Sequence, residues 1–207
     1  MRPGPSHWPR PDSPGPCADP YVQPVVPGPN CTLGTNPGRT YRFYNGTAVV
    51  PFGFGLSYTS FSYALVSAPA SVSLDPLRRL LTHTLDPRSA AANAFPSLLH
   101  TPRVGRYAIN VTNTGAIDAD DVVLGFISPP GAGRGGLPLK TLFGFERVHV
   151  RAGQTVTVFL YPSMTHLTAV TADGQREALS GSYTVTFGVH ETLRFGMGYA
   201  SVTLMAH

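Results

Sequence analysis

The stretch that decides the fold is residues 104–115, Val-Gly-Arg-Tyr-Ala-Ile-Asn-Val-Thr-Asn-Thr-Gly. Tyr107, Ile109 and Val111 share one face of an extended chain, because successive side chains of a β-strand point to opposite faces. Asn110 lies on the other, polar face, and the Asn-Thr-Gly that follows supplies turn residues. The stretch therefore predicts a half-buried strand that ends in a turn.

The same alternation recurs on both sides of this strand, with turn residues between the apolar runs. The predicted strands cover residues 58–66, 104–112, 122–127, 142–148, 156–160, 183–189 and 201–205. Asp173-Gly174 predicts a tight hairpin, and no stretch after residue 100 carries a convincing helical stripe. About seven short strands of this kind indicate an all-β chain folded as an antiparallel sandwich of two sheets.

Composition changes sharply near residue 38, which divides the chain into regions. Residues 1–38 contain eleven of the 21 prolines and five of the 22 glycines, so they are predicted to be a disordered or extended tail. Residues 39–66 form an aromatic-rich linker with the first strand, and residues 67–103 form a partly irregular insertion. Residues 104–207 supply the rest of the sandwich. Within the insertion a helix of about two turns is expected, with leucines on one face: Leu74, Leu77, Leu80 and Leu81.

Charge and hydropathy exclude several classes of partner. The 207 residues carry 15 Lys and Arg against 11 Asp and Glu, but the basic residues are scattered and form no run. A nucleic-acid partner is therefore not expected. No apolar run approaches the roughly 18 to 20 residues of a membrane span, so a membrane partner is not expected either. No signal peptide is visible at the start.

No residue is assigned a catalytic, cofactor-binding or metal-ligating role. The seven histidines are dispersed, and the glycine-rich residues 131–136 lack the Lys-Ser/Thr of a phosphate-binding loop, which favours a mobile loop between strands. Asp118, Asp120 and Asp121 lack the glycine and the terminal glutamate of an EF-hand loop, so these carboxylates are expected to face water.

The two cysteines, Cys17 and Cys31, both lie in the proline-rich region. They either close a short disulfide loop or remain free thiols, and disorder of the region favours free thiols. A zinc site is not expected, since four ligands at suitable spacing are missing.

Aromatic residues cluster ahead of the first strand, and glycines separate several of them. Such rings either stack on sugars or pack a seam between domains, and packing is the favoured interpretation. The residues assigned to interdomain packing are Tyr41, Phe43, Tyr44, Phe52, Phe54 and Tyr58.

Three asparagines stand in Asn-x-Ser/Thr sequons, namely Asn30, Asn45 and Asn110. They are predicted glycosylation sites and point to the secretory pathway or the cell exterior. Asn110 lies on the polar face of its predicted strand and is therefore available for modification. The alternative is that the sequons go unused in a protein that never enters that pathway.

Residues 37–44, Pro-Gly-Arg-Thr-Tyr-Arg-Phe-Tyr, and residues 51–59, Pro-Phe-Gly-Phe-Gly-Leu-Ser-Tyr-Thr, resemble segments of glycoside hydrolase family 3, closest to its β-xylosidase-like branch. Further matching landmarks lie at residues 111–115, 120–123, 142–148 and 181–185. The resemblance implies a fibronectin type III-like, immunoglobulin-like sandwich at the C-terminal end of such a protein. It also implies that both catalytic carboxylates come from domains preceding residue 37, so this chain alone is expected to be inactive and to be a fragment.

The expected function is therefore that of an accessory module in a glycosidase that hydrolyses O-glycosyl bonds in carbohydrate catabolism. The catalytic domains of the same protein would be its partner, with β-linked xylo-oligosaccharides as a further ligand, and no cofactor is expected. The alternative is a stand-alone secreted β-sandwich that binds carbohydrate or another protein.

Overall fold

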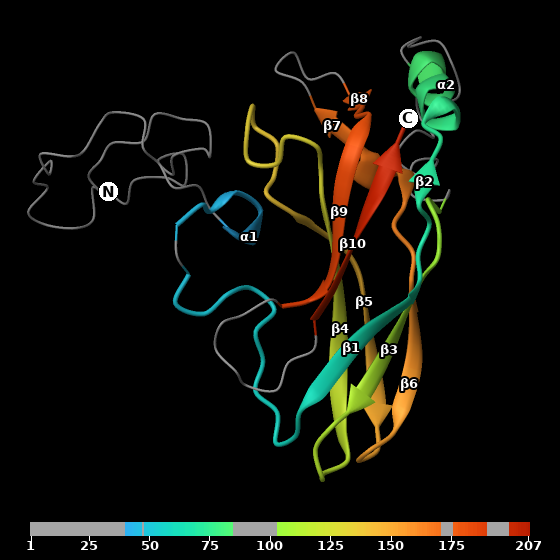
Figure 1. Ribbon diagram of the computed structural model, residues 1–207. Coiled ribbons are helices and arrows are strands. Elements are labelled where there is room, and N and C mark those ends of the chain that lie inside the picture. The colour runs from blue at the N-terminus through green and yellow to red at the C-terminus, as the bar shows by residue number, and fades with distance from the viewer. Residues whose placement is uncertain (1–39, 47, 85–102, 171–175, 190–198) are drawn as a thin grey trace, which may run out of the picture.

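The computed structural model describes residues 40–46, 48–84, 103–170, 176–189 and 199–207. Two sheets face each other in this part of the chain (Figure 1). The smaller sheet has the order β1-β3-β6, with β1 at Phe61–Ser67, β3 at Tyr107–Asn113 and β6 at Thr155–Leu160. The predicted all-β sandwich is confirmed.

The larger sheet has the order β2-β10-β9-β4-β5. Its strands are β2 at Ser71–Val72, β4 at Ala119–Ser128, β5 at Thr141–Val150, β9 at Gly181–Gly188 and β10 at Tyr199–Ala206. All neighbours pair antiparallel except β2, which lies parallel to β10. All seven predicted strands are present, with their bounds shifted by a few residues.

Three short strands were not predicted, since two or three residues are too few to show alternation. Besides β2, they are β7 at Thr168–Val170 and β8 at Arg176–Ala178, which pair as an antiparallel hairpin. The predicted Asp173-Gly174 turn lies outside the described residues, as does the predicted tail with both cysteines. A 3-10 helix at Met164–Leu167 precedes β7.

The insertion is more regular than expected as far as residue 84. It contains β2 and the helix α2 at Asp75–Thr84, which has ten residues and is longer than the two turns predicted. Pro76 is compatible with the helix because it lies in the first turn. Backbone N–H groups there have no acceptor within the helix, so no hydrogen bond is lost when proline lacks one. The leucine face is confirmed: Leu74 and Leu77 are fully buried, and Leu80 and Leu81 pack against the core. Residues 85–102 lie outside the described part.

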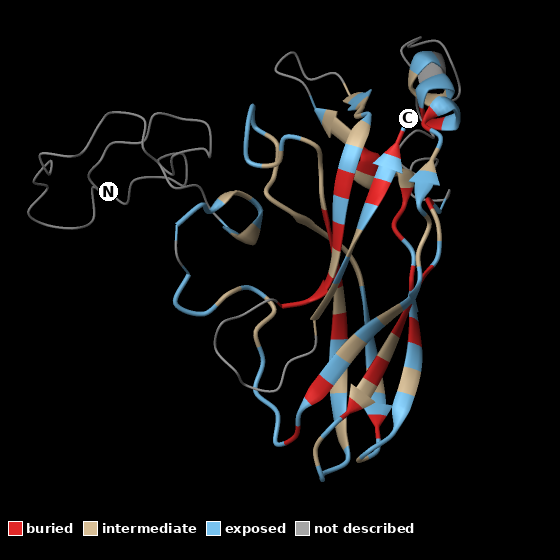
Figure 2. Cartoon of the chain, viewed as in Figure 1, coloured by how far each residue is buried: buried red, intermediate tan, exposed pale blue. Residues whose placement is uncertain are grey.

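The core lies between the sheets, and burial alternates along the central strands (Figure 2). Tyr107, Ile109 and Val111 are fully buried on β3, as the alternation predicted. They meet Tyr183 and Phe187 of β9 in a single apolar cluster. Burial of such side chains stabilises the folded state by roughly 1.5–3 kcal/mol each.

Asn113, the last residue of β3, closes one end of the sandwich. Its side chain is fully buried and hydrogen-bonded on both sides. Nδ2 donates to the carbonyl oxygens of Ile117 (2.8 Å) and Val150 (3.0 Å), while Oδ1 accepts from Thr59 Oγ1 (2.7 Å) and the Gly115 N–H (3.1 Å). One amide thereby joins the segment before β1, the turn after β3 and the end of β5.

We expect Asn113→Ala to lower the free energy of unfolding by about 3 kcal/mol, because the buried groups of Thr59 and Val150 lose their partners. Chemical denaturation followed by circular dichroism measures the change. The matched control is Asn110→Ala on the same strand, which removes one exposed hydrogen bond to Thr157 and should cost less than about 1 kcal/mol. Equal losses in the two variants would contradict this role.

Candidate functional site

The carboxylates of the acidic run at the start of β4 form hydrogen bonds and ion pairs with other residues of the chain. Asp118 Oδ1 accepts from the Ala152 N–H at 2.8 Å, and Asp120 binds Arg147 and His149, each at 2.7 Å. The expectation that these carboxylates face water is confirmed for Asp118 and Asp120, which are exposed, and the structure adds their pairing with other residues of the chain. The sequence did not reveal it, since the partners lie about 27 to 34 residues away and meet the run only through β4–β5 pairing.

Asp121 links the two sheets. Its Oδ2 accepts a 2.6 Å hydrogen bond from the Tyr63 hydroxyl of β1. Burial raises the pKa of Tyr63 well above its usual range, and the charge and hydrogen bond of Asp121 raise it further. The phenol therefore stays protonated and keeps donating to Asp121.

Within the described part of the chain, no three His, Cys, Asp or Glu side chains come together in a way that would hold a metal ion. None of the described helices is long and apolar enough to cross a membrane.

The aromatic segment, residues 41–58, packs partly on this chain's own larger sheet. Tyr41 stacks on Phe52 with ring centroids 4.2 Å apart, and both rings meet the edge of Phe126 on β4. The Tyr41 hydroxyl accepts a hydrogen bond from the Leu142 N–H at 3.1 Å. Gly53 has φ +88°, a conformation that other residues adopt only with strain, and a Cβ there would meet the terminal methyl of Leu124.

Other members of the segment stay open to solvent. Tyr58 is 95% exposed and Leu56 is 82% exposed, while Phe43 and Phe54 are partly buried and Tyr44 and Phe52 are exposed by more than a third. The sequence placed these aromatics against another domain. That interdomain contact stays a prediction. Within the described residues Tyr41 and Phe52 pack on Phe126, and Tyr58 is left uncovered.

The outer face of the larger sheet continues this apolar surface. Phe145 of β5 pairs with Leu124 of β4, beneath Gly53, and is 64% exposed. Val122, two residues before Leu124 on the same face, is also exposed. We call the aromatic segment together with Val122 and Phe145 the apolar face.

The predicted glycosylation sites are placed differently. Asn30 lies outside the described residues, and Asn45 is exposed next to α1 at Thr40–Phe43. Asn110 lies on the outer face of the smaller sheet, where its Oδ1 accepts from Thr157 Oγ1 at 2.8 Å. The apolar face and Asn110 are therefore on opposite outer surfaces of the sandwich.

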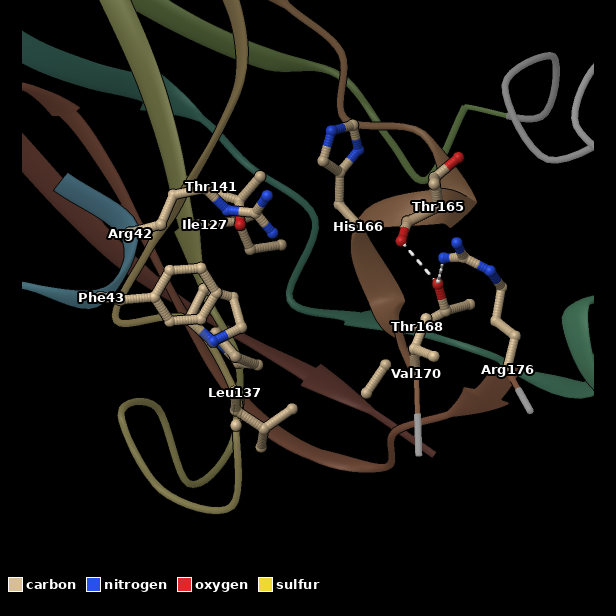
Figure 3. Close-up of a pocket in the computed structure, with 14 residues that line it drawn as sticks. Arg42, Phe43, Ile127, Leu137, Thr141, Thr165, His166, Thr168, Val170 and Arg176 are labelled. Carbon is tan, nitrogen blue, oxygen red and sulfur yellow. Dashed lines mark hydrogen bonds between the residues drawn. The ribbon is translucent and has the colours of Figure 1, made fainter. Parts of the chain in front are cut away.

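A cleft of about 410 Å³ lies beside α1 and was not foreseen from the sequence (Figure 3). Arg42 and Phe43 come from α1, His166 from the 3-10 helix and Arg176 from β8, so no sequence motif connects them. The loop between β4 and β5 was expected to be mobile. Here it forms one wall, where Leu139 N–H donates to Arg42 O at 2.6 Å and Gly133 N–H donates to Leu137 O at 3.1 Å.

Comparison with known families identifies part of the sandwich. A sequence model described as a fibronectin type III-like domain matches residues 121–191. β-D-xylosidase 1 of Arabidopsis thaliana is 40% identical over 168 residues, which are 75% of this chain and 20% of that protein. Exo-1,4-β-xylosidase of Emericella nidulans is 36% identical over 164 residues, covering 78% of this chain and 19% of that protein. The chain thus spans about a fifth of the length of the curated relatives it matches.

Solved structures give the same result. A glycoside hydrolase family 3 exo-β-xylosidase in complex with a xylobiose aziridine probe superimposes with a TM-score of 0.61 and 25% identity, over 83% of this chain and 20% of that one. A β-glucosidase from Erythrobacter marinus matches with a TM-score of 0.53 and 27% identity, over 81% and 18%. In each of these proteins the matched segment makes up about a fifth of the chain.

Asp120 should titrate below the ordinary pKa of 3.8, because the hydrogen bond from His149, followed by that from Arg147, favours its charged form. The folded state gains stability above pH 3.8 that it loses as the pH falls through the lower folded-state pKa. An NMR titration of the carboxyl carbons measures the midpoint. His149→Gln and Arg147→Gln should each raise it, while Arg151→Gln, on the neighbouring hairpin, should not. An unchanged midpoint in both variants would contradict the assignment.

Proposed function

Since the chain carries a fibronectin type III-like domain of the kind found in family 3 β-xylosidase-like proteins, we propose that it packs against the catalytic domains of such a glycosidase as an accessory module. In this proposal the catalytic domains hydrolyse O-glycosyl bonds in carbohydrate catabolism. The module's contribution is to stabilise or orient them.

The apolar face is the observation that carries this proposal. In the aromatic segment Tyr58 is 95% exposed and Leu56 is 82% exposed, and on the larger sheet Phe145 is 64% exposed. Large apolar side chains exposed in this way favour a contact with another protein surface, since their exposure to water is unfavourable. The partial packing of Tyr41 and Phe52 on Phe126 supports the same interpretation, because it holds the segment as a fixed surface.

The opposite surface has a different character. On the outer face of the smaller sheet, β1, β3 and β6 present mostly small or polar side chains around the exposed Val66 and Phe159. They are Ser62, Ala64, Asn110, Thr112, Thr155 and Thr157. This contrast between the two surfaces favours docking through the larger sheet.

A second function is a stand-alone secreted module that binds xylo-oligosaccharides or another protein. The observation that favours it is the cleft beside α1, which combines a partly buried aromatic ring with polar side chains. Binding of a partner would then not require the catalytic domains.

Docking is tested by adding the chain to the catalytic domains of Arabidopsis β-D-xylosidase 1 from which the matched fifth has been removed. We expect the two to associate, and Tyr58→Ser and Phe145→Ser to weaken the association about tenfold each, because central apolar anchors dominate such interfaces. Isothermal titration calorimetry gives the dissociation constants.

The matched control is Val66→Ser, which removes a side chain that is 56% exposed on the smaller sheet and should leave docking unchanged. Equal loss in all three variants would place the contact elsewhere. Failure to associate, together with a monodisperse chain that binds no hydrophobic dye, would favour the stand-alone module.

We further propose that Asn110 carries an N-linked glycan in a protein exported to the cell exterior. It lies on the surface opposite the apolar face, so a glycan there leaves docking free. Expressed in the secretory pathway of a eukaryotic cell, the chain should lose mass on treatment with an N-glycosidase.

Asn110→Gln should remove the part of the mass loss that comes from a glycan at Asn110. Asn45→Gln, in parallel, measures the contribution of the sequon at Asn45, which is exposed. The same mass shift in the parent and in Asn110→Gln would show that Asn110 is not used.

A further inference from the structure

The cleft beside α1 combines positive charge with an aromatic ring. Arg42 and Phe43 line it from one side and Arg176 from the opposite side, and His166 lies between the two sides (Figure 3). No Asp or Glu belongs to the lining formed by the described residues. Its volume of about 410 Å³ falls in the range of about 300–1,000 Å³ that is usual for small-ligand sites.

In the described part of the chain the two arginines have no counter-charge. No ion pair joins Arg42 or Arg176 to a carboxylate among the described residues, whereas Arg78 and Arg147 each have one. Arginine stays charged at every physiological pH, and its guanidinium group binds planar anions through paired N–H donors. Two such groups in one concave site attract an anion that presents several oxygen atoms.

Both walls of the cleft are held by hydrogen bonds. On one side the Leu139 N–H donates to Arg42 O, which ties α1 to the loop between β4 and β5. On the other side Arg176 Nη1 donates to Thr168 Oγ1 at 2.7 Å, and Thr168 Oγ1 donates to Thr165 O at 2.8 Å. A site whose walls are fixed before binding loses little conformational entropy on taking up a ligand.

The hairpin that carries Arg176 is anchored to the sandwich. The Leu179 N–H, just after β8, donates to Leu167 O at 3.0 Å, and the buried Tyr183 hydroxyl donates to Leu179 O at 2.8 Å. Arg176 is therefore positioned by the core rather than by the surface loop alone.

We propose that this cleft binds an acidic oligosaccharide, with a uronic acid carboxylate held by Arg42 and Arg176 and the apolar face of a sugar ring against Phe43. The choice of a saccharide rests on the proposed function, while the requirement for an anion rests on the cleft itself. A neutral sugar offers the arginines no charge to pair with, so it binds more weakly.

The test is a calorimetric titration of the full 207-residue chain with xylotriose and with xylotriose that carries a glucuronic acid branch. The acidic sugar should bind at least tenfold more tightly, and 0.5 M NaCl should reduce this advantage because salt screens exposed charges. Free glucuronic acid, as a third probe, should compete with the acidic sugar. Equal affinity for the neutral and acidic sugars, or no binding of either, would overturn the proposal.

Arg42→Gln and Arg176→Gln should each weaken binding of the acidic sugar about tenfold and leave binding of xylotriose unchanged. Arg42 is exposed, so its substitution does not endanger folding; Arg176→Lys, which keeps the charge but loses the paired donors, should give an intermediate loss. The matched control is Arg78→Gln on α2, which should bind as the parent does. Equal losses of affinity in the Arg42, Arg176 and Arg78 variants would show that the acidic sugar is attracted by net charge alone, which would overturn the proposed binding site.

This titration is independent of docking to the catalytic domains. Acidic sugar bound by a chain that does not dock would leave the cleft established and the accessory role refuted. Docking without binding of the acidic sugar would refute the cleft alone.

Discussion

The fold depends on the buried amide of Asn113. Four side-chain hydrogen bonds connect the end of β3 to the segment before β1, to its own turn and to the end of β5. The backbone of the same residue adds bonds to Gln154 and Gly153 in the β5–β6 turn. Because buried polar groups must find partners, this one side chain fixes how three segments meet at one end of the sandwich. It also fixes the direction from which the aromatic segment enters β1.

The two outer surfaces then take different roles. The aromatic segment runs back along the larger sheet, where Tyr41 and Phe52 cover Phe126, and it leaves Tyr58 and Phe145 open to solvent. The smaller sheet turns Asn110 outward among threonines. The hydrogen bond from Tyr63 to Asp121 joins the two sheets. A rigid sandwich with one apolar and one polar surface suits a module that supports a neighbouring domain.

The cleft forms because hydrogen bonds fix the segments that connect the strands around it. Four short pieces of chain, from α1, the β4–β5 loop, the 3-10 helix and the β7–β8 hairpin, converge at one end of the larger sheet. Each is anchored by a backbone or hydroxyl hydrogen bond, so the loops form walls of fixed shape. Binding sites commonly lie on loops that a scaffold holds in place, because loops vary without disturbing the core.

The sequence by itself determined the strands and the core, because alternation of apolar and polar side chains is a local property of the extended chain. Tyr107, Ile109 and Val111 were assigned to the interior from period alone, and they are fully buried. The leucine stripe of α2 was predicted in the same way, from the helical period.

Only the tertiary structure decided which segments meet. Pairing of β4 with β5 brings Asp120 to Arg147 and His149. Tyr41 contacts Phe126, which lies more than 80 residues away in the sequence. The cleft is lined by both Arg42 and Arg176, which lie near opposite ends of the sandwich sequence. Local periodicity specifies the face on which a side chain lies, but contacts between distant segments depend on register and topology, which no local pattern encodes.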